Sequence, residues 1–190
     1  MTTSSLYKVK IVKELSLHIL DIIQNSISAE ASFIQLMIDE KIEQDQLIIE
    51  IKDDGKGMNK EFLSKVTDPF VTSRTTRKVG LGISLLKANA EQCDGSFFID
   101  SKENEGTVIR AAFKHSHIDR PPIGNIVDTV ITLLVSNEEI DYRYAHRIDN
   151  NEFVMDTREI REILEGAPIA DLEVLEWLKN YLKENLESLV

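Results

Sequence analysis

The sequence predicts a mixed α/β protein in which helices alternate with antiparallel pairs of strands. Between about residues 13 and 29, apolar side chains recur every three or four positions, which is the spacing of one helical face. Residues 32–52 and 96–113 each contain two runs of strand character joined by a polar turn, as in a β-hairpin. A stretch that opens with glycines and continues with helical spacing separates the two hairpins. At 190 residues the chain has room for one full domain and a substantial extension.

The composition excludes several classes of function. A formal net charge of −11 argues against nucleic-acid binding by phosphate neutralisation and against adsorption on an anionic membrane. An acidic chain still binds nucleotides when local backbone amides or a metal ion meet the phosphates. The single cysteine, Cys93, excludes an internal disulfide, and we expect it to be a core residue. We find no signal-peptide pattern and no apolar run that would span a bilayer, so we expect a cytoplasmic protein.

The first predicted helix carries two short polar side chains, Asp21 and Asn25. They are four residues apart and therefore project from one face. In one interpretation they cap or pair locally, because buried polar groups need partners. In the other, Asn25 supplies an oxygen to a magnesium ion shared with phosphates, and Asp21 orients or deprotonates a nucleophile. We interpret His18, on the same helix, as a structural or surface residue and not as a phospho-acceptor.

The second strand of the first hairpin ends in Asp53, and glycines follow it at Gly55 and Gly57. Glycine weakens strand interiors and lets a backbone come close to a ligand. A carboxylate at the end of a buried strand can accept a hydrogen bond from the exocyclic amine of adenine, whereas a base with a carbonyl at that position would be refused. The alternative is an ordinary turn into the short helix predicted at residues 59–66.

Two later stretches favour the ligand interpretation. Residues 68–78 form a predicted loop with three basic side chains, which we interpret as phosphate contacts in preference to a solvated loop. Gly80 and Gly82 then open a helix, and free N–H groups at a helix start bind phosphate. In the second hairpin, Thr107 follows Gly106, so its hydroxyl can reach a ligand or a bound water.

Together these stretches resemble the Bergerat-fold (GHKL) ATP-binding domain of bacterial histidine kinases, anti-sigma-factor kinases, type II topoisomerases, MutL-like repair proteins and the Hsp90 chaperone. The resemblance covers about residues 13–114 and rests on five elements in order: Asp21-x-x-x-Asn25, Asp53-x-Gly55-x-Gly57, Asp68-Pro69-Phe70, Gly80-Leu81-Gly82 and Gly106-Thr107. It implies an α+β two-layer sandwich, with a mixed, mostly antiparallel sheet covered by helices on one face. It also implies that ATP and Mg²⁺ bind between the helices and a mobile lid.

The same resemblance implies roles for single residues. Asn25 would coordinate the metal, Asp53 would bind the adenine amine, and Thr107 would support adenine through water. Gly55 and Gly57 would shape the base pocket, while Gly80 and Gly82 would let the lid and helix approach the phosphates. The predicted catalytic residue is Asp21 and the predicted metal ligand is Asn25. The predicted cofactor-binding residues are Asn25, Asp53, Gly55, Gly57, Met58, Phe70, Thr72, Arg74, Lys78, Gly80, Leu81, Gly82 and Thr107.

Two positions depart from the family pattern. Asp21 stands where ATPases of this group often have glutamate, so its carboxylate is about one methylene further from an attacking water. This favours slow hydrolysis or a protein nucleophile. Lys78 stands where many kinases have a glycine, which puts the flexibility of the lid in question but offers a further phosphate contact.

We expect a histidine kinase-like ATP-binding domain at residues 1–118 and a C-terminal extension at residues 119–190. The Arg120-Pro121-Pro122 segment marks the break between them. Patterns in the extension predict a helix, a hairpin and two more helices, which pack on the core or dock a partner. Only about a dozen residues precede the first helix, so we expect a free-standing domain and not a complete sensor kinase.

Three functions remain open at this stage. The first is an ATP-dependent protein kinase that acts on a histidine or serine of a partner protein. The second is a slow regulatory ATPase, and the third is a non-catalytic, ATP-dependent partner-binding module of the anti-sigma-factor type. In all three we expect Mg²⁺, ATP and a partner protein, and neither nucleic acid nor a membrane.

Overall fold

The computed structural model of the chain describes residues 14–67 and 82–190. Over these residues the elements, in chain order, are α1 (Leu15–Ser28), β1 (Phe33–Lys41), the 3-10 helix η1 (Ile42–Gln44), β2 (Gln46–Asp53), α2 (Lys60–Leu63), α3 (Gly82–Gln92), β3 (Ser96–Lys102), β4 (Gly106–Lys114), α4 (Ile126–Ser136), β5 (Asp141–Ile148), β6 (Asn151–Asp156), α5 (Thr157–Ile163) and α6 (Leu172–Glu187). Of the described helices, none is both long enough and apolar enough to span a bilayer.

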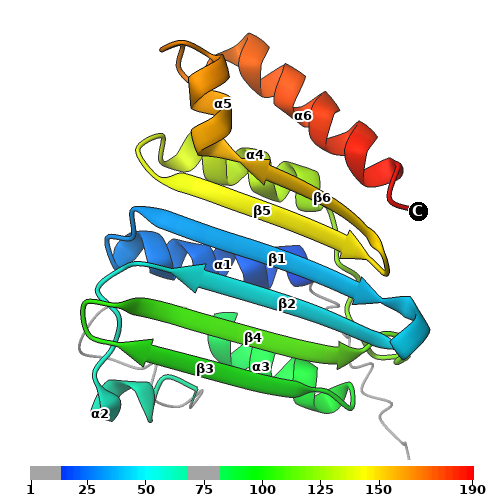
Figure 1. Cartoon of the computed structure of the whole chain (residues 1–190). Coiled ribbons are helices and arrows are strands. Elements are labelled where there is room, and N and C mark those ends of the chain that lie inside the picture. Colours follow the sequence, from blue (N-terminus) through cyan, green and yellow to red (C-terminus); the bar gives the residue numbers. More distant parts are fainter. Residues whose placement is uncertain (1–13, 68–81) are drawn as a thin grey trace, which may run out of the picture.

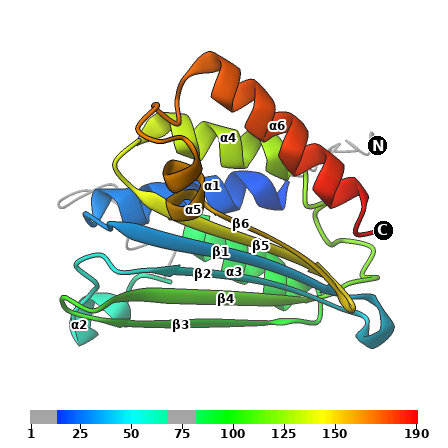
Figure 2. The same cartoon turned by 45° about the horizontal axis from the view of Figure 1, so that its top comes forward.

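The described strands form one six-stranded sheet in the order β3-β4-β2-β1-β5-β6. Within it β1 and β5 run parallel, and every other neighbouring pair is antiparallel. Helices α1, α3 and α4 cover one face of this sheet, and α6 packs on α4 (Figures 1 and 2). The prediction of a mixed, mostly antiparallel sheet covered by helices on one face is therefore confirmed.

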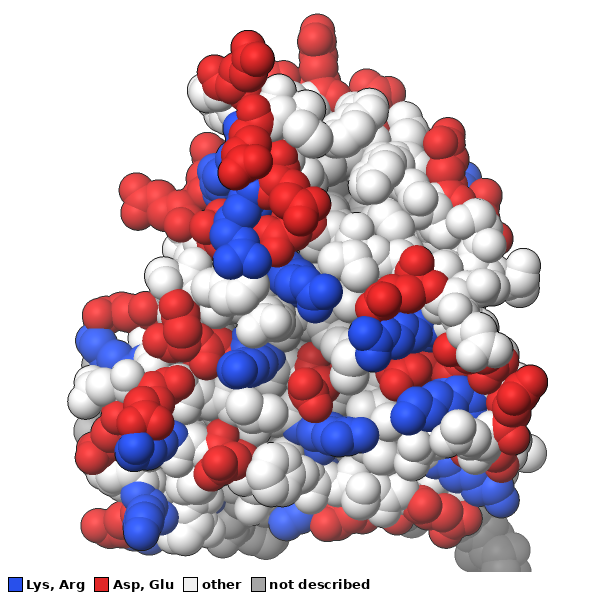
Figure 3. Space-filling view, viewed as in Figure 1, with Lys and Arg blue, Asp and Glu red and all other residues white. Residues whose placement is uncertain are grey.

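Side-chain alternation along the strands separates a core face from an outer face. On the core face, Leu36 of β1 lies between its neighbours Ile51 of β2 and Tyr144 of β5, and all three are buried. The outer face carries charged side chains of both signs, as the space-filling view shows (Figure 3). Lys52 and Arg110, which alternate with buried residues, belong to this solvated face.

Helix α1 forms because its apolar residues follow helical spacing and face the sheet. Leu15, Ile19, Ile22 and Ile23 are at most 1% exposed. The first N–H groups of a helix have no partner within it. Here the backbone N–H groups of Leu15 and Ser16 donate to the carbonyls of Pro122 and Ile123, at 2.9 and 2.8 Å. The linker after β4 therefore caps the helix on which the predicted metal ligand lies.

The segment that follows residue 118 continues both the sheet and the core. Strand β5 pairs with β1 over eight residues, and α4 packs on α1. The buried apolar residues of both parts belong to one hydrophobic cluster. Leu178 and Leu182 of α6 are fully buried in it. We keep residue 119 as the proposed boundary, because the linker to α4 begins there.

Hydrogen-bonded polar side chains join β1, β5 and the end of β4 at the edge of the sheet where β1 ends. The two Glu40 carboxylate oxygens accept from Nε2 of His146 and of His115, both at 3.0 Å. The Tyr144 hydroxyl and Nδ1 of His146 form a hydrogen bond at 2.7 Å. Burial and the nearby Glu40 charge raise the pKa of Tyr144, which keeps its hydroxyl protonated.

These contacts make Glu40 an ionised group inside the fold. Burial favours its neutral form, but the hydrogen bonds from His146 and His115 outweigh this and hold the pKa of Glu40 below its ordinary value of 4.5. Because the folded pKa is depressed, the stabilisation is complete above the unfolded pKa. It is lost as pH falls through the folded value.

Replacing Glu40 by Gln should lower the free energy of unfolding at pH 7 by about 1.5–3 kcal/mol, since one hydrogen bond to a charged acceptor is lost and the amide offers a donor to a donor. The loss of stability between about pH 5 and 2 should also become shallower, because this group no longer titrates. Urea denaturation at several pH values measures both effects. Glu43→Gln, at an exposed position of η1, is the control and should leave the pH profile unchanged. An unaltered Glu40→Gln profile would show that the network contributes nothing.

Candidate functional site

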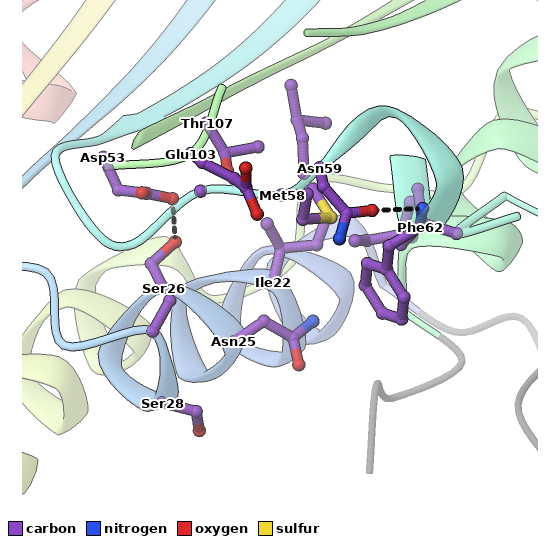
Figure 4. Close-up of a pocket in the computed structure, with 15 residues that line it drawn as sticks. Ile22, Asn25, Ser26, Ser28, Asp53, Met58, Asn59, Phe62, Glu103 and Thr107 are labelled. Atoms are coloured by element: carbon purple, nitrogen blue, oxygen red, sulfur yellow. Dashed lines mark hydrogen bonds between the residues drawn. The ribbon is translucent and has the colours of Figure 1, made fainter. Parts of the chain in front are cut away.

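A cavity of about 360 Å³ opens at the end of the sheet where β2 stops and β4 begins (Figure 4). It lies between the sheet, α1, and the α2 segment. Its walls are mostly apolar, with a few polar groups, which is the usual character of a small-molecule site. The lining residues are Ile22, Asn25, Ser26, Ser28, Ala29, Asp53, Gly57, Met58, Asn59, Phe62, Val66, Ile83, Glu103, Thr107 and Ile109.

Asp53 is the buried acid of this cavity. It is the last residue of β2 and is 7% exposed. Its Oδ1 accepts from the backbone N–H of Gly55 at 3.0 Å, and its Oδ2 accepts from the Ser26 hydroxyl at 2.6 Å. Both contacts fix the plane of the carboxylate, while each oxygen keeps acceptor capacity for a ligand.

The glycines after Asp53 are required by close packing. A Cβ on Gly55 would lie 2.9 Å from the carbonyl oxygen of Ala29, at the end of α1. Gly57 has φ +60°, and a Cβ there would lie 2.7 Å from the carbonyl carbon of Lys102 in the β3–β4 hairpin. The turn is thus held against both α1 and the hairpin. Of the two glycines, Gly57 lines the cavity, whereas Gly55 lies behind it against α1.

Thr107, the second residue of β4, lines the cavity. Its hydroxyl lies 2.9 Å from the Ser101 hydroxyl, which also accepts from the Met58 backbone N–H and donates to the Gly106 carbonyl. Since Ser101 has one proton and gives it to Gly106, Thr107 donates to Ser101. The Thr107 oxygen therefore keeps lone pairs for a group in the pocket.

Asn25 lies on the cavity side of α1. Its amide projects toward the side on which Phe62 lies (Figure 4). Its Nδ2 is buried and has no hydrogen-bond partner within the described part of the chain. A buried amide without a partner costs free energy in the fold, so Asn25 is a position where a ligand would satisfy the structure.

Asp21 lies one helical turn before Asn25 and outside the cavity lining. The start of α3 packs against it, because a Cβ on Gly82 would lie 2.7 Å from the Cβ of Asp21. The structure thus joins the first and fourth predicted motifs, with Gly82 buried and Asp21 exposed. Asp21 faces the N-terminal end of α3, where backbone N–H groups lack helical partners.

Several predicted residues lie outside the described part of the chain and stay predictions. They are Phe70, Thr72, Arg74, Lys78, Gly80 and Leu81. Met58 lines the cavity as expected. His18 is buried, and its Nε2 lies 3.1 Å from the Asn89 amide of α3. Cys93 is buried as well, in agreement with its expected place in the core.

Sequence patterns missed several residues of the site, among them Ser26, Asn59, Phe62, Ser101 and Glu103. For Ser26 a signal exists, because it lies four residues after Ile22 on the buried side of α1 and a buried hydroxyl needs a partner. Ser101 pairs with Thr107 only in the observed hairpin register. Phe62 and Glu103 reach the cavity through tertiary packing, which no local pattern reports.

Comparison with known proteins decides the family. The model of the family described as histidine kinase-, DNA gyrase B-, and HSP90-like ATPase matches residues 10–117, more than half of the chain. The chain belongs to this ATPase family. The resemblance expected from the five motifs is thereby confirmed.

The ATPase-family domain is similar to parts of larger kinases. It is 35% identical over 96 residues to the sensor histidine kinase WalK of Bacillus subtilis, covering 47% of this chain and 16% of that protein. It is 34% identical over 67 residues to sporulation kinase E of the same organism, covering 35% and 9%. The chain therefore spans less than a fifth of the length of either kinase.

Among solved structures, the MutL ATPase domain of Aquifex aeolicus, complexed with ADP, aligns with a TM-score of 0.46 and 12% sequence identity. The alignment covers 82% of this chain and 70% of that one.

Gly57→Ala should lower the free energy of unfolding by about 2–4 kcal/mol, because a left-handed backbone conformation and a backbone clash add together. Gly166→Ala is the matched control. Gly166 also has positive φ, at +100°, but a Cβ there would meet nothing within 4 Å, so we expect a loss of about 1 kcal/mol. Chemical denaturation compares the two variants. Equal losses would mean that the turn does not depend on packing against the hairpin.

Proposed function

We propose that this domain binds Mg-ATP and transfers the γ-phosphate to a histidine or serine of a partner protein. The observation that carries the proposal is the Asp53 carboxylate, held at the end of β2 by Ser26 and Gly55 and directed at an apolar cavity. A fixed carboxylate accepts from the exocyclic amine of adenine. The similarity to kinases in Bacillus subtilis supports phosphoryl transfer as the reaction.

Asn25 fits the role of magnesium ligand. Magnesium in phosphoryl-transfer sites commonly takes one or two protein oxygens and fills its other positions with phosphate and water. The described residues contain no group of three or more His, Cys, Asp or Glu able to hold a metal ion by themselves. We therefore expect Mg²⁺ to bind together with the nucleotide. When bound, the ion would neutralise phosphate charge and orient the triphosphate.

The phosphate tail would extend from Asn25 toward the start of α3. Gly82 brings that helix end close to α1, and its free N–H groups favour a bound anion. Asp21 lies at the same junction, so it would orient or deprotonate the accepting group. These local dipoles offset the net charge of −11, which by itself repels ATP.

A second function is favoured by one observation. Asp21 lies outside the cavity lining and against Gly82. Its side chain is one methylene shorter than that of the glutamate common in related ATPases. A domain with this arrangement would hold ATP and a partner without rapid turnover. This is the binding-module alternative, and a slow regulatory ATPase lies between it and the kinase.

Incubation with γ-labelled ATP and Mg²⁺ separates these functions. Label on a partner protein that co-purifies with the chain is the result expected for the kinase. Free phosphate at steady turnover would mark the ATPase, and tight ATP binding without either product would mark the binding module.

Asn25→Ala should abolish label transfer and remove the magnesium dependence of ATP affinity. If that dependence persists, the ion binds elsewhere.

Asp53→Asn should weaken ATP binding by about ten- to a hundredfold, which corresponds to about 1.5–3 kcal/mol for a hydrogen bond to a charged group. Titration calorimetry with ATP measures the change. Asp100→Asn, at an exposed position on the outer face of β3, serves as the control and should bind ATP normally. If the Asp53→Asn variant binds ATP with normal affinity, adenine does not bind at this end of the cavity.

A further inference from the structure

The hydrogen bond of Ser26 is unusual for a serine inside a helix. Such a serine commonly donates to the carbonyl four residues earlier. Ser28, on the same helix and also in the cavity wall, does this with Gln24 at 2.8 Å. Ser26 instead donates out of the helix to Asp53, 27 residues away in sequence, at 2.6 Å. Ser26 is only 4% exposed, so water does not compete readily for this bond.

The bond restricts what Asp53 can offer a ligand. Ser26 lies on one carboxylate oxygen and the Gly55 N–H lies on the other. The carboxylate cannot turn about its own axis without breaking both contacts. Each oxygen keeps a lone pair, but the plane in which these lone pairs point is set by α1 and the turn. Figure 4 shows Ser26 and Asp53 facing each other across the junction of α1 and β2.

We infer that Ser26 is a positioning residue which orients Asp53 toward the 6-amino group of adenine and so makes the pocket select adenine over guanine nucleotides. The inference rests on the proposed ATP site. It adds to that site the residue that sets base selectivity.

The chemistry of the two bases explains the selectivity. Adenine presents one amine at position 6, which a single fixed acceptor satisfies. Guanine presents a carbonyl there, while its N1–H and 2-amino donors lie side by side. A carboxylate binds such a pair best when both oxygens face the base. Ser26 and the Gly55 N–H already occupy one acceptor position on each Asp53 oxygen, and a carbonyl opposite either oxygen would stay unpaired.

Thr107 also favours adenine over guanine. Its proton is committed to Ser101, so it offers the pocket an acceptor. Thr107 thus offers an acceptor, and not a donor, to a guanine carbonyl placed beside it. The Ser26 hydroxyl donates to the Asp53 carboxylate, and the Ser101 hydroxyl donates to the Gly106 carbonyl, so neither proton is available to a base.

A nucleotide that lacks only the 6-amino group tests the inference. Purine riboside triphosphate has hydrogen in place of this amine and is otherwise identical to ATP. If Ser26 acts through Asp53 on the amine, Ser26→Ala should weaken Mg-ATP binding by about tenfold but weaken the analogue by less than about twofold. The preference of the wild-type chain for ATP over GTP should fall in the same variant. Titration calorimetry measures all three nucleotides.

The controls use neighbouring chemistry. Ser28→Ala removes a hydroxyl from the same helix and cavity wall and should leave all three affinities unchanged. Ser26→Thr retains the hydroxyl and should keep most of the preference for ATP over the analogue. If thermal melting shows that the alanine variant is unfolded, Ser26→Cys replaces it, because a thiol fills similar space but is a weak donor.

Equal weakening of ATP and the analogue would overturn the inference, since it would assign Ser26 to the shape of the fold alone. Unchanged affinities would overturn it as well. Failure of the proposed function gives a different result, because the wild-type chain would then bind neither ATP nor the analogue. Tight ATP binding by the wild-type chain, with equal losses in the variant, would leave the ATP site standing and remove only the role of Ser26.

Discussion

The cavity depends on one junction, where the carboxylate at the end of β2 meets the helix that lies across it. Asp53 is bonded to Ser26 of α1 and to its own turn at Gly55, so three separate pieces of backbone share one buried anion. An ionised side chain in an apolar wall is stable only when hydrogen bonds compensate its lost hydration. The hydrogen bonds from Ser26 and Gly55 compensate the lost hydration of the Asp53 carboxylate and also fix its orientation. Ligand recognition and the integrity of the fold are therefore coupled at this point.

The sheet beyond this junction forms one continuous body. Strand β5 extends it in parallel to β1, and the linker before α4 caps α1. Glu40 joins β1 to β5 through His146 and to the end of β4 through His115. The residues after 118 consequently support α1 from the side opposite α3. The extension is connected to the cavity through α1, since this helix lines the cavity and packs on both α3 and α4.

Much of the site could be read from residue order because its chemistry requires particular residue types at short spacing. Asp21 and Asn25 lie one helical turn apart, and Gly55 and Gly57 follow Asp53 where only glycine fits. These are local requirements, and local requirements leave local patterns. Glu103 and Phe62 gave no comparable signal, because an acid and an aromatic ring are ordinary residues until the fold brings them to one cavity.

The sequence alone determined the family, the order of helices and strands, and the identity of the buried acid, since each follows from periodicity or from motifs with few physical alternatives. Tertiary structure alone decided that β5 lies beside β1 and that Ser26 bonds to Asp53. It also decided that Thr107 meets Ser101 and that Asp21 lies against Gly82 instead of in the cavity wall. Those contacts join residues far apart in the chain, and their formation depends on packing and register, which are properties of the whole sheet.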